Sequence, residues 1–234
     1  MTGTGGEGDG AALGAGPPGG FRERWGGAGD GRLSSPAAER NTAPIVAALG
    51  PLLAGVSGAV LEIGSGTGQH GAAIAAAFAD ILWQPSEADA RNMASIAGWA
   101  AGVANIRPPI RLDAMADWAG SAELAELGPL AGVFSANVIH IAPWGVAEGI
   151  VAGAGRCLAP GGRLIFYGPF RETGAHVSEG NIRFDASLRA QDARFGIRDL
   201  EAVAALATEA GLGPAAVTEM PANNRLVAFA RPPA

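Results

Sequence analysis

The most informative stretch of the chain is Val60-Leu61-Glu62-Ile63-Gly64-Ser65-Gly66-Thr67-Gly68, an apolar run that ends in three alternate glycines. Glycine lets a backbone turn sharply and approach a ligand closely, because no Cβ stands in the way. The stretch predicts a strand over residues 59–64, a glycine loop after it, and a helix over 71–79. Doubly wound sheets bind ligands at this place, beyond the carboxyl ends of their strands. The alternative is a tight turn with a purely structural role.

The segments that follow repeat the same order of an apolar strand and a helix. Further strands are predicted over 81–85, 109–113, 131–137 and 162–169, with helices over 88–101, 121–128, 148–158 and 198–211. Strands that are apolar throughout belong to a parallel sheet covered by helices on both faces. Two last strands, over 215–220 and 225–232, are expected to form an antiparallel pair. The pattern predicts a doubly wound, Rossmann-like α/β fold with a mostly parallel seven-stranded sheet and an antiparallel last strand.

The N-terminal segment differs in composition from this pattern. Residues 1–35 are rich in glycine and broken by proline, so they cannot bury enough apolar surface to offset the entropy lost on ordering. They are predicted to form a flexible tail. Phe21 and Trp25 are its aromatic residues, and the alternative for these two is that they dock on the body of the protein or on a partner.

Residues 36–234 are predicted to form one domain. It is expected to open with a helix that is capped by Ser34 or Ser35 and broken at Pro44 and Pro51, because proline removes a backbone donor from a helix interior. Near the other end of the domain, the polar and arginine-bearing stretch after Pro169 is long for a loop. It is predicted to be a functional segment or a lid.

Composition argues against several classes of protein. The chain has 234 residues, a formal net charge of -6, and 16 cationic side chains that are all arginine. Nucleic-acid binding depends on clustered cations, so no nucleic-acid partner is expected. No apolar run is long enough to span a membrane, and the first residues lack the basic and apolar regions of a secretory signal. The single Cys157 fits a reducing cytoplasm, and the three histidines lack the spacing of a metal site. A soluble cytoplasmic protein without a metal is expected.

Two cofactors compete for the glycine loop. Residues 66–71, Gly66-Thr67-Gly68-Gln69-His70-Gly71, match a dinucleotide fingerprint with Glu87 about 20 residues further on, which favours an NAD(P)-dependent oxidoreductase. In that fold, however, the first fingerprint glycine follows the strand directly, whereas here the strand already ends at Ile63 and Gly64. Glu62, inside the strand end, also needs a cation or an amide network if it is buried. S-adenosylmethionine (SAM) offers an ammonium group, a carboxylate and a ribose, without a pyrophosphate.

The order acid, apolar, Gly, x, Gly, x, Gly resembles the first motif of class I SAM-dependent methyltransferases. The resemblance implies that Gly64, Gly66 and Gly68 pass under the cofactor and that Glu62 organises its amino-acid end. It also implies that Asp113, at the end of the third predicted strand, accepts the adenine amino group, unless it only starts a turn.

A carboxylate at the end of the second predicted strand suits a ribose diol, because it can accept both hydroxyl protons. Glu87 is the candidate for this role, with Ser86 or Gln84 as alternatives. The competing interpretation of Glu87 is a helix-capping or surface acid.

The chain resembles one family in particular, through strings spread from about Glu39 to Arg231. This is the methyltransferase-like protein 26 family, once known only as a domain of unknown function. The resemblance implies a SAM-dependent methyltransferase fold and names no acceptor. Thr42, Phe195 and the segment 177–180 depart from the family pattern, so the acceptor is the least transferable feature. The strings include Glu39-Arg40-Asn41, residues 61–70, Trp83-Gln84-Pro85-Ser86, Ile139-His140-Ile141, Tyr167-Gly168-Pro169, Ser187-Leu188-Arg189, residues 196–201 and Met220-Pro221-Ala222-Asn223-Asn224.

Methyl transfer needs the two reacting atoms to be brought together and, for some acceptors, one base. His140 follows the fourth predicted strand and is the candidate base, and Asn137 is the candidate for orienting the acceptor or the amino group of the cofactor. Tyr167 and Trp144 offer aromatic faces to the sulfonium or to an acceptor. The alternative for all four is an ordinary role in packing or in a turn.

The arginines after Pro169 are candidates for binding an acidic group of the acceptor, since guanidinium binds carboxylate or phosphate in bidentate fashion. A solvated, salt-bridged surface is the alternative for each. The favoured function is methyl transfer from SAM to a small molecule, and a non-catalytic SAM-binding or partner-binding module is the third hypothesis. These arginines are Arg171, Arg183, Arg189, Arg194 and Arg198.

Overall fold

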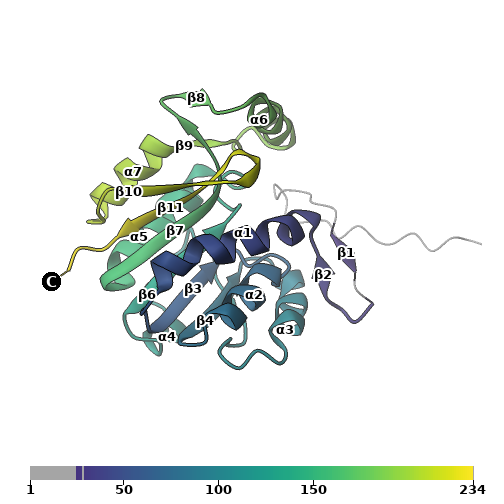
Figure 1. The fold of residues 1–234 in the computed structure, drawn as a ribbon, viewed down its shortest axis with the longest axis vertical. Coiled ribbons are helices and arrows are strands. Elements are labelled where there is room, and N and C mark those ends of the chain that lie inside the picture. The colour runs from purple at the N-terminus through teal and green to yellow at the C-terminus, as the bar shows by residue number, and fades with distance from the viewer. Residues whose placement is uncertain (1–24, 28, 234) are drawn as a thin grey trace, which may run out of the picture.

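The computed structural model describes residues 25–27 and 29–233 of the chain. Within this part, none of the helices combines the length and the apolar character that crossing a bilayer requires. The expected tail lies mostly outside the described residues, and so does Phe21. The rest of the expected tail forms a small antiparallel hairpin of β1 (Gly26–Gly27) and β2 (Leu33–Ser34), which lies at one end of the molecule beside the third helix (Figure 1).

One large sheet forms the centre of the molecule, and its strand order is β10-β11-β7-β6-β3-β4-β5. The strands from β7 to β5 run parallel, and β11 runs antiparallel to both of its neighbours, β7 and β10. The prediction of a mostly parallel sheet with an antiparallel last strand is therefore confirmed. The strands are β3 (Gly58–Ile63), β4 (Ile81–Glu87), β5 (Ile110–Arg111), β6 (Leu130–Ala136), β7 (Leu158–Glu172), β10 (Ala215–Met220) and β11 (Asn224–Ala230).

The order of the strands creates a topological switch point next to β3, where open α/β sheets have their ligand-binding crevice. Strands β4 and β5 follow β3 on one side of the sheet, and strands β6 and β7 are added on the other side of β3. The order in which successive strands are added therefore reverses between β3 and β6. In open α/β sheets, ligands bind outside the carboxyl ends of the strands at such a switch point. The glycine loop follows β3 at this point.

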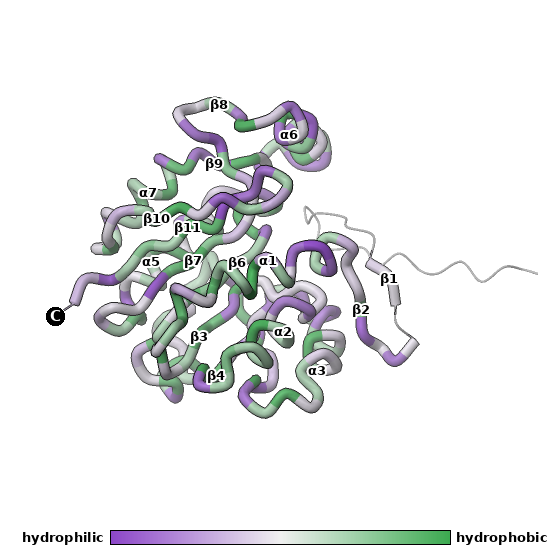
Figure 2. Tube along the Cα trace, viewed as in Figure 1, coloured by the Kyte–Doolittle hydropathy of each residue, from purple (hydrophilic) through white to green (hydrophobic). Residues whose placement is uncertain are grey.

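Helices cover both faces of the sheet, because alternate residues of each strand point to opposite sides. On β3, Leu61 and Ile63 face the core under α5 and α7, whereas Val60 faces the core under α1 and α2. Figure 2 shows that the central strands are largely hydrophobic. The helices are α1 (Pro36–Leu53), α2 (Gln69–Ala77), α3 (Met93–Ala100), α4 (Ala122–Ala125), α5 (Trp144–Cys157) and α7 (Leu200–Glu209), with short 3-10 turns η1 (Ala90–Asn92) and η2 (Pro221–Asn223).

Helix α1 is continuous, so the prediction that it breaks at Pro44 and Pro51 is wrong. Ser35 caps it as expected, with Ser35 Oγ accepting a hydrogen bond from Ala38 N at 3.3 Å. Each proline removes one backbone donor, but the helix buries its apolar side on the sheet, and tertiary packing provides most of the stability of helices in proteins. The carbonyl that Pro44 leaves without its usual partner is that of Arg40, which lies on the exposed side of the helix.

The segment after Pro169 is mostly regular structure and not a loop. Strand β7 continues to Glu172 and pairs there with β8 (Ala175–His176) and β9 (Arg198–Asp199), while helix α6 (Glu179–Gln191) lies between these two strands in sequence. Figure 1 shows β8, β9 and α6 together beyond one end of the sheet. The sequence pattern did not indicate α6 because this helix is largely hydrophilic (Figure 2) and carries no apolar stripe. The interpretation of the segment as a functional element or a lid stays a prediction.

Candidate functional site

The glycines of the loop after β3 serve different purposes. Gly68 has a φ of +94°, and a Cβ placed on it would stand 2.7 Å from the Cα of Ile96, so this glycine allows α3 to pack against the loop. A Cβ on Gly64 would meet the side chain of Val138 at 2.5 Å. Among the described residues, only the ring of Trp25 comes within 4 Å of the Cβ position of Gly66. Gly66 is therefore the glycine of the set whose Cβ position is least enclosed by the described residues.

Glu62 lies beneath the loop and holds it in place. Its side chain is 2% exposed, and its Oε2 accepts hydrogen bonds from Ser65 Oγ at 2.8 Å and from Trp83 Nε1 at 3.1 Å. Gly71 lacks the Cβ that would collide with this carboxylate. Burial raises the pKa of Glu62 to about 7, although both hydrogen bonds oppose the shift. Glu62 thus acts on the crevice through the conformation of the loop, and its role toward a cofactor stays a prediction.

Glu87 joins the end of β4 to the loop. Its Oε2 accepts a hydrogen bond from Gly66 N at 2.8 Å, and its Oε1 accepts one from Asp89 N at 3.0 Å. Burial raises the pKa of this carboxyl above its ordinary value. The two alternatives have other partners, since Gln84 donates to Pro108 O at 2.9 Å and Ser86 Oγ donates to Glu62 O at 2.6 Å. Glu87 is therefore the polar side chain of the three that reaches the loop.

Asp113 follows β5 in an exposed loop, where its Oδ1 accepts a hydrogen bond from Met115 N at 2.9 Å. This loop is packed on α5, whose Gly149 and Gly153 leave room for the carbonyl of Ala114 and for the ring of Trp118. Trp118 Nε1 donates to Gly149 O at 3.0 Å. The carboxylate thus has the turn-starting contact that was its structural alternative, and its role toward adenine stays a prediction.

Asn137 and His140 converge on β7 on the other side of the crevice. Asn137 has a φ of +58°, an uncommon conformation for a residue other than glycine, and its N–H donates to Tyr167 O at 2.8 Å. Gly168 has a φ of +153°, and a Cβ on it would lie 3.0 Å from His140 Cε1 and 3.3 Å from Asn137 Oδ1. The glycine therefore permits both side chains to approach the end of β7.

His140 is buried and neutral. Its side chain is 2% exposed, and its ring meets the edge of the Phe184 ring at a centroid distance of 5.8 Å. Burial, and then the charge of Arg198, lower its pKa to about 3. Within residues 25–27 and 29–233 neither ring nitrogen has a hydrogen-bond partner. The imidazole is thus available as a hydrogen-bond acceptor.

Arg198 braces the backbone around His140. Its Nε donates to Ile139 O at 2.9 Å, and its Nη2 donates to Ala142 O at 2.7 Å. The guanidinium also lies over the Trp144 ring, 5.6 Å from the ring centroid. Arg198 therefore both fixes the loop after β6 and lowers the pKa of the imidazole within it.

Tyr167 is less accessible than the sequence suggested. Its side chain is 3% exposed, and it packs in the core under α1. Its hydroxyl accepts a hydrogen bond from Asn224 Nδ2 at 3.1 Å, and burial raises its pKa to about 12. A phenol with such a pKa is a poor proton acceptor near neutral pH.

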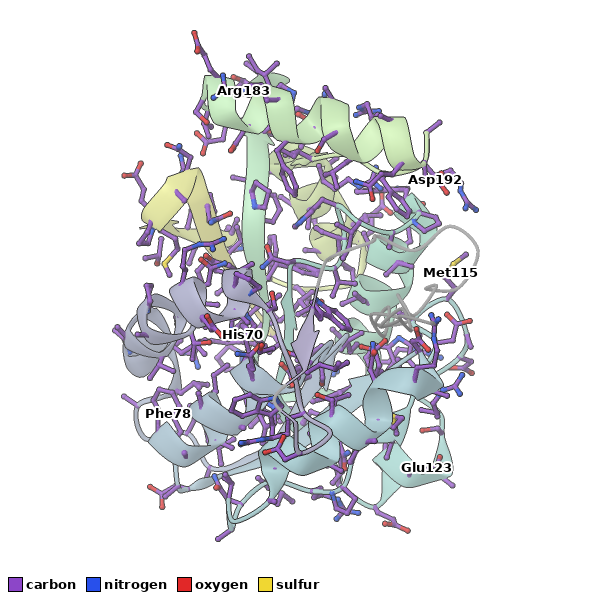
Figure 3. All side chains as sticks on the ribbon, turned by 90° about the vertical axis from the view of Figure 1, so that its right-hand side faces the viewer. His70, Phe78, Met115, Glu123, Arg183 and Asp192 are labelled. Atoms are coloured by element: carbon purple, nitrogen blue, oxygen red, sulfur yellow. The ribbon has the colours of Figure 1, made fainter. Side chains whose placement is uncertain are left out.

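The five arginines considered for an acidic acceptor group all have partners. Arg171 pairs with Asp199 at 2.5 Å and Arg189 with Asp185 at 2.7 Å. Arg194 pairs with Asp192 at 2.6 Å, and Arg198 binds backbone carbonyls. Figure 3 shows Arg183 at the end of α6, directed away from the body of the molecule, and its partner is Glu179 at 3.7 Å. A salt-bridged surface is therefore the better description of this set.

Sequence reasoning missed several contributors to the site. Ser65 and Trp83 were not recognised as the partners of Glu62, although a buried carboxylate at a strand end requires donors on the loop or on the neighbouring strand. Gly168 and Phe184 were missed as neighbours of His140, because this contact joins residues that are distant in the sequence.

The described residues contain no group of three or more His, Cys, Asp or Glu side chains that could hold a metal ion. His70 lies beside α1 (Figure 3), with its Nδ1 hydrogen-bonded to Thr42 Oγ1 at 2.9 Å. Burial lowers the pKa of His70 to about 4, so this imidazole is neutral and joins α2 to α1.

Comparison with protein families matches residues 32–231 to a family described as "Protein of unknown function (DUF938)". Among solved structures, the chain is similar to human N-acetylserotonin methyltransferase in complex with SAM, with a TM-score of 0.67 and 12% identity over 83% of this chain and 52% of that one. It is also similar to an O-methyltransferase family protein from Burkholderia thailandensis, with a TM-score of 0.64 and 13% identity over 84% of this chain and 60% of that one.

A third similar structure, described as PigF with SAH, has a TM-score of 0.66 and 16% identity over 82% of this chain and 56% of that one. The chain thus spans little more than half the length of these solved structures. Identities this low show the fold alone, which is the Rossmann-like α/β fold of class I methyltransferases.

Proposed function

This chain belongs to the family described as "Protein of unknown function (DUF938)", and within that family we propose that it is a SAM-dependent methyltransferase acting on a small molecule. The observation that carries the proposal is the pairing of Gly66 N with Glu87 Oε2 at 2.8 Å, at the switch point of the sheet. A carboxylate beside the glycine loop at this point is suited to a ribose diol, and this supports the proposal. We also propose that the family is that of methyltransferase-like protein 26, from the strings that the chain shares with it.

The residues of the crevice fit SAM better than a dinucleotide. A dinucleotide requires its pyrophosphate at the N-terminus of the helix after the loop. Here Gly68, at that N-terminus, is packed against the backbone of Ile96, and Gln69 Oε1 accepts a hydrogen bond from Ser35 N at 2.6 Å. The start of α2 is therefore occupied by protein, which argues against the NAD(P)-dependent oxidoreductase.

Each half of SAM has candidate partners in this chain. Glu87 is suited to accept hydrogen bonds from the ribose hydroxyls, and Asp113 to accept one from the adenine amino group. Asn137, on the other side of the crevice, has amide groups suited to the amino-acid end. When bound, SAM supplies a methyl group on a positively charged sulfur.

His140 is suited to orient a hydroxyl acceptor. It is neutral, so one ring nitrogen can accept a hydrogen bond from an O–H group and hold that oxygen in place. A pKa of about 3 makes the imidazole a weak base, so positioning of the hydroxyl is its first contribution, ahead of proton removal. We propose a hydroxyl oxygen as the methylated atom, and the O-methyltransferase family protein among the similar structures agrees with this choice.

The experiment that tests this function is isothermal titration of the full chain with SAM, NAD and NADP, followed by incubation with methyl-labelled SAM and a fractionated metabolite extract. Binding of SAM and transfer of the label to a small molecule are expected. Binding of NAD or NADP without any binding of SAM would overturn the proposal in favour of the oxidoreductase. Binding of SAM without a labelled product would favour the non-catalytic module.

A further inference from the structure

The hairpin of β1 and β2 is held against the glycine loop by hydrogen bonds. Leu33 N donates to Ser95 Oγ at 2.8 Å, and Trp99 Nε1 donates to Leu33 O at 2.8 Å. Ser95 Oγ in turn donates to Thr67 O at 2.7 Å, so one side chain contacts both the hairpin and the loop. The guanidinium of Arg32 lies over the Trp99 ring, 4.5 Å from its centroid. The hairpin therefore has a defined position relative to the loop.

The end of the hairpin is fixed to the loop in the same way. Gln69 Oε1 accepts hydrogen bonds from Ser35 N at 2.6 Å and from Thr67 Oγ1 at 3.0 Å. Thr67 and Gln69, on the two sides of Gly68, are thus linked to the segment that leads from β2 into α1.

Trp25 lies at the other end of the hairpin, directly before β1, and its ring covers Gly66. The Cζ2 and Cη2 atoms of the indole are 3.8 Å and 3.9 Å from the position of a Cβ on Gly66, and the side chain is half-buried. The N–H of the same glycine donates to Glu87 Oε2. An aromatic ring and a carboxylate therefore flank one residue of the loop from different sides.

We propose that Trp25 is a cofactor-binding residue whose indole forms an aromatic wall for the nucleoside half of SAM. This inference rests on the proposed function. A nucleoside needs a carboxylate for its ribose hydroxyls and a flat apolar surface for its base, and stacking on an aromatic side chain contributes to binding of any base. Glu87 and Trp25 offer these two groups on either side of Gly66. Because the hairpin is anchored by its own hydrogen bonds, the ring is in position before the cofactor arrives, and such preorganisation favours affinity.

The test compares the full-length wild type with Trp25→Ala and Trp25→Phe by isothermal titration with SAM, S-adenosylhomocysteine and 5′-methylthioadenosine. The alanine variant is expected to bind all three about tenfold more weakly, because all three contain the adenosine, and the phenylalanine variant within about threefold of the wild type. Thermal unfolding without ligand verifies that the variants are folded. Equal affinities of wild type and Trp25→Ala would overturn this inference alone. Tighter binding by Trp25→Ala would overturn it too, since the ring would then fill the pocket instead of walling it.

Arg32→Ala provides the matched control, because it keeps the indole of Trp25 but weakens the docking of the hairpin on Trp99 that positions it. A smaller loss of affinity is expected in this variant, and it should vanish in the Trp25→Ala background, because the two residues act through one contact. Fully additive losses would contradict a role of the hairpin in placing the ring. Absence of binding by the wild type to any of the three ligands would overturn the proposed function and this inference together.

Discussion

His140 is neutral throughout the range in which most enzymes work, because burial and the charge of Arg198 lower its pKa to about 3. An imidazole in this state accepts one hydrogen bond without competing for the proton. The kcat of the proposed reaction should therefore show no transition near pH 6.5, where a solvent-exposed histidine changes its charge. The same burial disfavours protonation of His140 in the folded protein, whereas the histidine of the unfolded chain protonates near pH 6.5. The contribution of the neutral ring to the stability of the fold is therefore lost as the pH falls below about 6.5.

Replacement of His140 by glutamine is expected to lower kcat by about 100-fold, because the acceptor loses its oriented hydrogen bond. Affinity for SAM should change little, since the role proposed for His140 is toward the acceptor and not toward the cofactor. Steady-state kinetics and isothermal titration measure the two quantities separately. His70→Gln is the matched control, because that imidazole joins α1 to α2, and it should retain kcat. An unchanged kcat in His140→Gln would remove His140 from the mechanism.

Glu62 changes the stability of the protein with pH in the opposite direction from a carboxylate whose pKa is lowered by folding. Its pKa rises from 4.5 in the unfolded chain to about 7 in the folded protein, so the folded protein holds a proton that the unfolded chain has released. Between about pH 4.5 and pH 7 the contribution of Glu62 therefore makes the protein less stable as the pH rises. His70 and His140, whose pKa values are lowered, act in the opposite direction below about pH 6.5.

Glu62→Gln isolates the contribution of Glu62, because the histidines are the same in both proteins. The amide oxygen of glutamine can still accept from Ser65 Oγ and Trp83 Nε1, and it does not titrate. The variant is expected to gain stability over the wild type progressively from pH 5 to pH 8, by up to about 3 kcal/mol. Thermal unfolding of both proteins at several pH values measures the difference. A difference that does not depend on pH would show that Glu62 is ionised at neutral pH.

The glycines of α5 position the loop that carries Asp113. Gly149 and Gly153 face the carbonyl of Ala114 and the ring of Trp118, so the loop lies directly on the helix backbone. Gly145 is one turn earlier on the same side of the helix, but a Cβ on it would meet only the flexible ends of two side chains, Met115 at 3.1 Å and Glu148 at 3.8 Å. Met115 is 60% exposed and has room to move, as its place at the surface in Figure 3 indicates.

Gly149→Ala and Gly145→Ala should consequently have effects of opposite sign. The first forces the loop away from α5 and is expected to cost about 1–3 kcal/mol of stability, as overpacking does. The second removes a flexible glycine from a helix without a rigid obstacle and is expected to be neutral or to stabilise by up to about 1 kcal/mol. Urea unfolding with an unchanged m-value measures both. Equal losses in the two variants would contradict the packing argument.

The central strands were predictable and the elements at the sheet ends were not. Strands β3, β4 and β6 are buried on both faces, so their apolar runs mark them within a few residues. Helix α6 buries only Asn181, Asp185 and Leu188, and a pattern with two polar buried positions does not indicate a helix. Strand β5 is reduced to Ile110–Arg111 because it pairs with β4 alone at the edge of the sheet.

The location of the site was predictable, whereas the partners of its side chains were not. The glycine pattern predicts the loop, but a shift of one residue exchanges the two faces of a strand, so the sequence left Gln84, Ser86 and Glu87 as alternatives. The hydrogen bond from Asn224 to Tyr167 and the edge contact between the rings of Phe184 and His140 depend on how distant segments come together. Sequence patterns carry no information on such contacts.

Binding at the crevice should stabilise the whole fold, because the site draws on residues from the hairpin, β4, β6 and the loop after β3. A ligand that binds only the folded protein, at 100 times its Kd, adds about 2.7 kcal/mol to the free energy of unfolding. For a chain of this size that corresponds to an increase of about 5–10 °C in Tm. SAM is expected to give this shift in a thermal unfolding assay, and NAD and NADP are expected to give none. A shift with NADP alone would contradict the proposed cofactor.

The ends of the segment that carries α6 meet side by side. Phe170 on β7 pairs with Arg198 on β9, and Arg171 pairs with Asp199, so the chain leaves the sheet and returns to it at one place. The segment between these two points leaves the order of the seven central strands uninterrupted, and it reaches the loop after β6 through the contact of Phe184 with His140. Under the proposed function, we therefore expect exchanges within this segment to alter the choice of acceptor more than the binding of the cofactor.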